Sequence, residues 1–213
     1  MRSHAKPSRR MHWVVMGIDL AGSERRNTGI CVMDERRNVK TWIVHTDKEI
    51  VELVKEYMPE VIAIDAPLSL PKGRKRIDEK CDIHFRLCDL ELRKRGIKFF
   101  PITLGPMRML TRRGIELKKK LQQMGFEVIE VYPGATQDLF GLPRKQQGLE
   151  RLKKGLERLG VKGLKDVMSG DELDAITAAL TAILYLEGKC EEIGDPSEGL
   201  MVIPKVKRKH SRE

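Results

Sequence analysis

The chain has 213 residues, of which 40% are hydrophobic and 34% are charged. This length allows one domain with a sizeable core or two small ones, and the recurring apolar runs exclude a disordered chain. No apolar run reaches the roughly 18 residues that a membrane helix needs, so we expect neither a membrane span nor a signal peptide. The four cysteines are too few for a disulfide scaffold, and we expect reduced thiols in a cytoplasmic protein.

The net charge of +10 is distributed unevenly along the chain. The first ten residues carry four Lys or Arg, and the last ten carry five against one Glu. Residues 72–120 carry sixteen Lys or Arg against six Asp or Glu, so the remaining residues are net acidic. A basic central segment and two basic tails favour a nucleic-acid partner. Solubility of the tails and a thermophilic composition explain part of the same charge.

The first third of the chain predicts three strands and a helix. Residues 13–19, 28–33 and 40–45 are apolar runs separated by turn residues, a pattern typical of an antiparallel meander. Residues 47–58 have apolar side chains at helical spacing behind a capping Thr46 or Asp47, and Pro59 ends the helix. Residues 61–65 form a second apolar run that ends in an acid. A strand buried on both faces predicts a parallel neighbour covered by helices.

The remaining elements complete one α/β domain over residues 13–203, between basic tails at 1–12 and 204–213. The basic residues 68–125 are predicted to form an insertion on the sheet, with helices over about 77–94 and 113–124. Residues 126–132 predict a third core strand, which Pro133-Gly134 terminates. A helix is predicted over about 149–159. A capping box of Ser169 and Glu172 predicts another over 170 to about 187, and residues 200–203 predict a short last strand.

Acidic residues stand at the ends of the predicted core strands and at the start of the last helix. Asp19, Asp65 and Glu130 would gather at one sheet edge if their strands are parallel neighbours. Asp171 and Asp174 share a helix face of small residues and could reach the same edge. Several carboxylates in one place must be protonated, paired with basic groups or bound to a divalent cation. Their oxygen ligands suit Mg²⁺ or Mn²⁺, which can activate water for phosphodiester hydrolysis.

Each acid also has a structural explanation. An Asp just after a strand can cap the following turn, which applies to Asp19 and Asp65. Asp171 lies where the helix dipole favours any carboxylate. Asp174 is harder to explain in this way, because a carboxylate without a role would be costly on a face that packs on the sheet. Glu130 could pair with a basic residue of the insertion.

Four segments resemble the DUF429 family of predicted nucleases with a ribonuclease H-like fold. They are Gly17-Ile18-Asp19-Leu20-Ala21-Gly22-Ser23, Ile64-Asp65-Ala66-Pro67-Leu68, Glu130-Val131-Tyr132-Pro133-Gly134 and Asp171-Glu172-Leu173-Asp174-Ala175. The resemblance implies a mixed five-strand sheet in the order 3-2-1-4-5 with helices on both faces. It also implies a metal-dependent acidic site at Asp19, Asp65 and the helix pair. The Asp-x-x-Asp-Ala motif is similar to that of RuvC-type Holliday junction resolvases, although Met168, Ser169 and Gly170, and no resolvase-like His, stand directly before Asp171.

Basic residues of the central segment, residues 72–120, are candidates for binding the nucleic-acid substrate of a nuclease. They could neutralise phosphates and position a nucleic-acid strand over the metal ions, in a salt-dependent contact. The alternative is that the arginines form ion pairs on helix surfaces with Asp82, Asp89 and Glu91. The candidates for substrate contact are Ser23, Arg86, Arg93, Arg112 and Arg113.

The sequence therefore predicts a divalent-metal-dependent nuclease, with Mg²⁺ or Mn²⁺, that acts on DNA or RNA. Asp19 and Asp65 would hold the metal ions, Asp171 and Asp174 would complete the coordination, and Glu130 would assist. Two alternatives stay open: a non-catalytic nucleic-acid-binding protein with structural acids, and a phosphotransfer protein with an actin-like fold. Proteins of the second kind normally need two copies of the fold, and 213 residues hold one. The sequence does not predict the oligomeric state.

Overall fold

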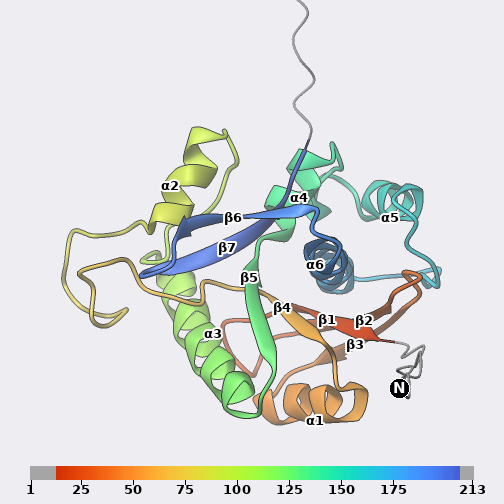
Figure 1. Cartoon of the computed structure of the whole chain (residues 1–213), viewed down its shortest axis with the longest axis horizontal. Coiled ribbons are helices and arrows are strands. Elements are labelled where there is room, and N and C mark those ends of the chain that lie inside the picture. Colours follow the sequence, from red (N-terminus) through yellow and green to blue (C-terminus); the bar gives the residue numbers. More distant parts are fainter. Residues whose placement is uncertain (1–12, 207–213) are drawn as a thin grey trace, which may run out of the picture.

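A seven-stranded mixed sheet runs through the computed structural model, which describes residues 13–206 (Figure 1). Its strand order is β3-β2-β1-β4-β5-β7-β6. β1, β4, β5 and β7 are parallel neighbours, whereas β2 is antiparallel to β1 and β3, and β6 is antiparallel to β7. The strands are β1 (Val14–Asp19), β2 (Thr28–Asp34), β3 (Val39–Val44), β4 (Val61–Asp65), β5 (Glu127–Val131), β6 (Cys190–Asp195) and β7 (Gly199–Pro204). The predicted basic tail 1–12 and residues 207–213 of the other tail lie outside the described residues.

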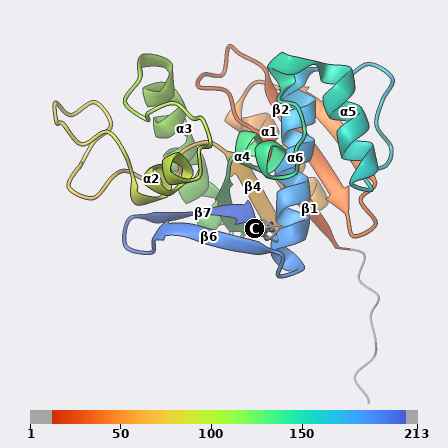
Figure 2. The same ribbon diagram turned by 90° about the horizontal axis from the view of Figure 1, so that it is seen from above.

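Helices cover both faces of this sheet (Figures 1 and 2). Apolar side chains of α1 and α3 pack on one face, and those of α5 and α6 pack on the other. α2 packs beside β6 at the far edge. The helices are α1 (Asp47–Tyr57), α2 (Leu87–Lys94), α3 (Gly105–Gln123), α4 (Pro133–Leu139), α5 (Leu149–Arg158) and α6 (Gly170–Leu186), with a 3₁₀ turn η1 at Lys145–Gln147. In residues 13–206 no helix is both long and apolar enough to cross a membrane.

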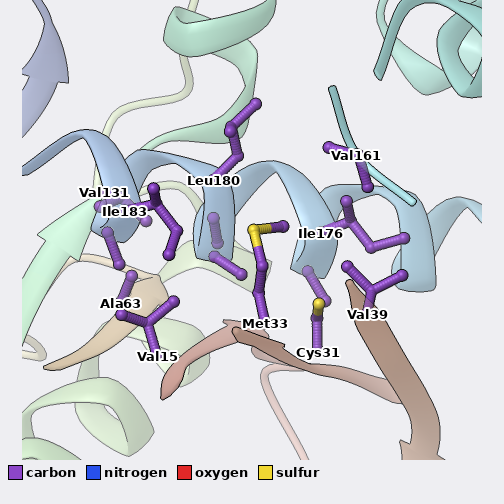
Figure 3. Packing of buried hydrophobic residues seen from close by; sticks show 14 of the residues in the cluster. Val15, Cys31, Met33, Val39, Ala63, Val131, Val161, Ile176, Leu180 and Ile183 are labelled. Carbon is purple, nitrogen blue, oxygen red and sulfur yellow. The ribbon is translucent and has the colours of Figure 1, made fainter. Parts of the chain in front are cut away.

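α6 lies unusually close to the sheet because glycines stand beneath it. A Cβ atom on Gly17 of β1 would lie 2.1 Å from the carbonyl oxygen of Ala175, and one on Gly29 would lie 2.1 Å from that of Asp171. Figure 3 shows side chains of the sheet, such as Met33, directed toward Ile176 of α6. The predicted small-residue face of this helix therefore packs on the sheet. Its close approach brings the first turns of α6 to the end of β1.

The ribonuclease H-like α/β fold is confirmed, with the core strand order β3-β2-β1-β4-β5 and helices on both faces. The five strands that the resemblance implies are too few, because the sheet continues beyond β5 with β7, the short last strand predicted at 200–203, and with β6. β6 was not predicted, because its sequence is mostly polar and Ile193 is its only buried residue. An edge strand of this kind lacks the alternating apolar pattern that reveals most strands.

The helix predicted over residues 77–94 is wrong in its first half. The structure has a loop there, and α2 begins only at Leu87. The guanidinium group of Arg74, a residue that is 6% exposed, donates hydrogen bonds to the carbonyl oxygens of Ile77, Glu79, Cys81 and Ile83. These bonds take up carbonyl groups that an α-helix would use internally. α3, by contrast, begins eight residues before the predicted start, at Gly105, and buries apolar side chains against the sheet.

Candidate metal centre

Three carboxylates meet where β1 and β4 end. Asp19 and Asp65 are paired in register as the last residues of these parallel strands. Both point to the sheet face that α6 covers, because Val15, four residues before Asp19, and Ala63, two residues before Asp65, pack in the core of that face. Asp174 reaches them from the second turn of α6. One oxygen atom from each of Asp19, Asp65 and Asp174 lies within 4.8 Å of the other two.

The amino group of Lys145 lies among these acids. Its Nζ atom is 3.0 Å from Asp19 Oδ2, 2.9 Å from Asp174 Oδ2 and 3.3 Å from Asp171 Oδ1. Burial alone would lower the pKa of Lys145, but the charges of Asp19 and Asp174 raise it above its ordinary value. The lysine is therefore a permanent cation that occupies carboxylate oxygens which could also coordinate a metal ion.

One ammonium group does not balance the whole cluster. Burial, followed by the charges of Asp174 and Asp171, raises the pKa of Asp19 to about 7 even though Lys145 acts in the opposite direction. Burial and the charges of Asp19 and Asp174 raise the pKa of Asp65 well above its ordinary value. Full ionisation of these carboxylates at neutral pH thus requires more positive charge than the described residues supply. Oxygen ligands that need a cation fit a hard divalent ion.

The structural explanation of the two strand-end acids does not match their contacts. An Asp that caps a turn accepts hydrogen bonds from backbone N–H groups of that turn. The side chain of Asp19 contacts only Lys145 by hydrogen bond or ion pair within residues 13–206. Across the same residues the side chain of Asp65 makes no such contact. These two carboxylates are therefore held at the sheet edge without serving the turns that follow them.

Asp171 and Gln137 complete the surroundings of the cluster. Asp171 lies in the first turn of α6 and contacts Lys145, but it is not part of the three-carboxylate group. Gln137, which is 1% exposed, donates a hydrogen bond of 2.7 Å to Asp174 Oδ1 and so orients that carboxylate. Both Gln137 and Lys145 follow β5, within residues 135–148, for which the sequence predicted no helix or strand. The available signal was Pro133, because proline at the first position is typical of a helix start.

Glu130 is not one of the three grouped carboxylates, although it lines the same cavity as Asp65 and Asp174. It pairs with Ile64 in the sheet register, whereas Asp65 pairs with Val131, so Glu130 and Asp65 project from opposite faces. Its Oε2 atom accepts hydrogen bonds of 2.7 Å from the backbone N–H of Leu68 and from Arg86 Nη1. The structure therefore does not bring Glu130 into the group that could bind a metal ion. Glu130 is instead paired with a basic residue, Arg86, which is the alternative stated for this acid in the sequence analysis.

Arg86 is buried rather than available to a phosphate. It is 1% exposed, and its guanidinium group contacts Glu130 and both carboxylate oxygens of Asp89. Arg113 is 7% exposed and donates hydrogen bonds to Asp47 and to the carbonyl oxygens of Ala21 and His45. Every partner of these two arginines lies within the fold. Their predicted contact with substrate is thus replaced by a role in holding loops and helices in place.

The other predicted substrate contacts are at the surface. The guanidinium group of Arg93 stacks on the ring of Phe85, 4.1 Å from its centroid, and Arg112 forms an exposed ion pair with Asp78. Neither arginine lines the cavities next to the carboxylates. Ser23 does line one of them, together with Asp19. Of the five predicted contacts, Ser23 and the buried Arg86 therefore line cavities beside the cluster, and Arg93, Arg112 and Arg113 line neither.

A groove made of two adjoining cavities passes over the acidic cluster. The more polar cavity, of about 450 Å³, is lined by Asp19, Ser23, Arg26 and Asp171. The other, of about 290 Å³, is lined by Asp65 and Asp174 and by aromatic side chains. The two cavities share three lining residues, Met107, Leu110 and Lys145. A polymeric ligand lying in the groove would pass directly over the carboxylates.

Comparison with known proteins gives a family but no assigned activity. Two solved structures of Thermus thermophilus RuvC match most of the chain, one of them in complex with a Holliday junction substrate. The complex is 16% identical, with 83% of this chain and 97% of that chain covered and a TM-score of 0.47. The other is 15% identical, with 82% and 96% covered and a TM-score of 0.47. No curated protein matches the chain. The model of the DUF429 family, described as a protein of unknown function, matches residues 17–199, and the chain belongs to this family.

Proposed function

We propose that this protein is a divalent-metal-dependent nuclease that hydrolyses phosphodiester bonds of DNA or RNA. The observation that carries the proposal is the group of Asp19, Asp65 and Asp174, whose ligand oxygens lie within 4.8 Å of one another. The two cavities that form the groove adjoin these carboxylates, and a polymeric substrate would lie across both. A set of carboxylate oxygens suits Mg²⁺ or Mn²⁺ better than softer metals.

The proposed chemistry divides between the metal and the side chains. A bound divalent ion lowers the pKa of a coordinated water and stabilises charge on the phosphate. Asp19, Asp65 and Asp174 would hold the ion, and the hydrogen bond from Gln137 orients the Asp174 carboxylate. Lys145 would compete with the metal ion for the carboxylate oxygens of Asp19 and Asp174. Its ammonium group lies at the groove, where it can neutralise a phosphate oxygen.

The polar cavity beside Asp19 would hold the adjoining phosphodiester backbone. Ser23 and Arg26 line this cavity and offer a hydroxyl group and a guanidinium group as hydrogen-bond donors. Such contacts position a strand without reading its sequence. Arg26 takes the phosphate-binding role that the sequence analysis gave to Arg86 and Arg113, because those two arginines are enclosed by the fold.

The direct test is cleavage by the full-length chain of labelled single-stranded, duplex and branched DNA and RNA. Mg²⁺, Mn²⁺ or EDTA is present in parallel reactions. We expect cleavage of at least one substrate with either metal and none with EDTA. Binding of nucleic acid that is unchanged by metal, with no cleavage of any substrate, would contradict the proposal. That result would favour a non-catalytic binding protein instead.

Metal affinity is expected to rise with pH. In the metal-free chain the pKa of Asp19 is about 7 and that of Asp65 is well above its ordinary value, so metal must displace protons at lower pH. The affinity for Mg²⁺ should rise with pH by up to about tenfold per pH unit for each proton that the metal displaces, and it should level off above the pKa values of the two carboxyl groups. Isothermal titration in two buffers with different ionisation enthalpies measures the affinity and the number of protons released.

The same pKa shift has the opposite effect on the stability of the metal-free chain. The pKa of Asp19 is higher in the folded state than the ordinary 3.8, so the folded chain binds this proton more tightly than the unfolded chain does. The stability gained from this proton is fully present below pH 3.8. It is lost as the pH rises through about 7. Thermal unfolding without metal should therefore occur at lower temperature as the pH rises through this range, and Mg²⁺ should reverse the loss. A metal affinity that is independent of pH would contradict both expectations.

A further inference from the structure

We propose that the aromatic cavity of the groove binds one unpaired nucleobase that carries an amino group, beside the phosphodiester bond at the acidic cluster. This inference rests on the proposed function and names the feature of the substrate that the site selects. The cavity, of about 290 Å³, lies between α2, α3 and the segment that follows β5. Small-molecule pockets measure roughly 300–1,000 Å³, so this volume suits a single base rather than a helix or a peptide.

The cavity walls offer flat apolar surfaces next to the metal site. Phe99, Phe100 and Tyr132 line it together with Asp65 and Asp174. Aromatic side chains of this kind provide stacking surfaces for bases that are not stacked in a duplex. Because the rings and the carboxylates line the same cavity, one nucleotide can place its phosphate at the acidic cluster and its base between the rings.

The aromatic walls are held in place before any ligand binds. The Tyr132 hydroxyl donates a hydrogen bond to the carbonyl oxygen of Lys98 and accepts one from Arg144. Arg144 also donates to that carbonyl oxygen and pairs with Asp138. The ring of Phe99 packs edge-to-face on Phe85, with centroids 6.1 Å apart. A pocket that is already formed loses less entropy on binding, and this favours a rigid, planar ligand.

Phe100 is the exception to the usual burial of large apolar side chains. It is 69% exposed, and its ring lines the cavity. An exposed aromatic ring contributes little to the hydrophobic core, so its place beside a metal site favours contact with a ligand. The same exposure means that Phe100 can be removed with little effect on folding.

A buried acceptor on the cavity wall selects the kind of base. Glu130 lines the cavity, and its Oε1 atom is buried without a hydrogen-bond partner among the described residues. Leaving such an atom unpaired is costly, and an N–H group of a ligand would satisfy it after a small adjustment of the wall. Cytosine, adenine and guanine can donate this bond from an exocyclic amino group, whereas the one N–H donor of uracil in a nucleotide, N3–H, lies between two carbonyl groups that a carboxylate repels.

The test uses mononucleotides, because they contain no phosphodiester bond and report binding without cleavage. Isothermal titration of the full-length protein with Mg²⁺ compares cytidine 5′-monophosphate, uridine 5′-monophosphate and ribose 5-phosphate, which has no base. We expect the cytidine nucleotide to bind roughly 5- to 100-fold more tightly than ribose 5-phosphate, the range of stacking contributions. It should also bind more tightly than the uridine nucleotide.

Two single-residue variants test whether the nucleotide binds in this cavity. Phe100→Ala should remove most of the preference for the nucleotide over ribose 5-phosphate. Leu104→Ala is the matched control, because Leu104 is 47% exposed in the same segment and does not line either cavity of the groove. It should leave the preference unchanged, and circular dichroism confirms that both variants are folded.

The outcomes separate this inference from the proposed nuclease activity. Equal affinity for the cytidine nucleotide and ribose 5-phosphate overturns the base pocket even if the protein cleaves nucleic acid. Equal affinity for the cytidine and uridine nucleotides overturns the selection of an amino group. A base preference that Phe100→Ala removes supports the pocket. It does so even if no cleavage is found, which would count against the nuclease proposal alone.

Discussion

Asp65→Asn is expected to abolish specific Mg²⁺ binding and to lower metal-dependent cleavage by more than roughly 100-fold. Loss of a residue that only supports a metal ligand already costs about 10- to 100-fold, so loss of a ligand should cost more. Asn has nearly the shape of Asp but provides one carbonyl oxygen and no negative charge. Isothermal titration measures the metal affinity, and cleavage of the best substrate measures the activity.

The same substitution should leave stability unchanged or raise it in the metal-free chain. Burial and the charges of Asp19 and Asp174 raise the pKa of Asp65, which means that its ionised form is unfavourable in the folded state. An Asp that served only to cap a turn would have the opposite effect, because its loss would destabilise the fold. Thermal unfolding of the variant without metal distinguishes the two roles.

Asp82→Asn is the matched control for this experiment. Asp82 is an exposed acid of the loop before α2 and lines none of the cavities at the cluster. Its substitution makes the same chemical change and should alter neither metal affinity nor cleavage. If Asp65→Asn also retained metal binding and cleavage, the three-carboxylate group would not be the catalytic centre.

Arg86→Ala is expected to lower the free energy of unfolding by about 3–5 kcal/mol, the usual cost of removing one partner of a buried ion pair. The substitution leaves the carboxylates of Glu130 and Asp89 buried without their shared cation. Both acids are less than 5% exposed, so water cannot replace the lost contacts. Urea unfolding measures the change, and the slope of the transition shows whether the folded state stays compact.

A surface ion pair provides the control for this second prediction. Arg95 contacts Glu191 through two hydrogen bonds of 2.8 and 3.0 Å, but both side chains are about one-third exposed. Arg95→Ala should therefore cost less than about 1 kcal/mol. Equal costs for the two variants would contradict the structural role assigned to Arg86. So would a stable Arg86→Ala protein with weakened nucleic-acid binding, the result that a phosphate contact would produce.

The elements that the sequence predicted well are those with strong local signals. β1, β2, β3 and β4 are apolar runs bounded by turn residues, and each was predicted to within a residue or two. α6 begins with the predicted capping box, in which Ser169 and Glu172 exchange hydrogen bonds. These signals depend on residues that are only a few positions apart in the chain, so they can be recognised without knowledge of the fold.

Membership of the DUF429 family and the order of the core strands could also be predicted from the sequence. Asp19 and Asp65 end two buried runs, and parallel pairing of such strands places their last residues side by side. Whether Glu130 joins these acids was not predictable, because its position depends on the register between strands. A shift of one residue along β5 changes the face from which a side chain projects, and this distinction is invisible in a single apolar run.

The sequence by itself determined the α/β fold, the strand ends that carry Asp19 and Asp65, and the close packing of α6 that delivers Asp174. Only the tertiary structure decided that Lys145 enters the acidic cluster, and that Arg86 is enclosed between Glu130 and Asp89. Lys145 lies 126 residues from Asp19 along the chain, and Arg86 lies 44 from Glu130. Local patterns predict helices and strands because hydrogen bonding and burial repeat along a segment. The partner of a charged side chain depends instead on how distant segments pack, and the energy of that contact appears only once water has been excluded from between them.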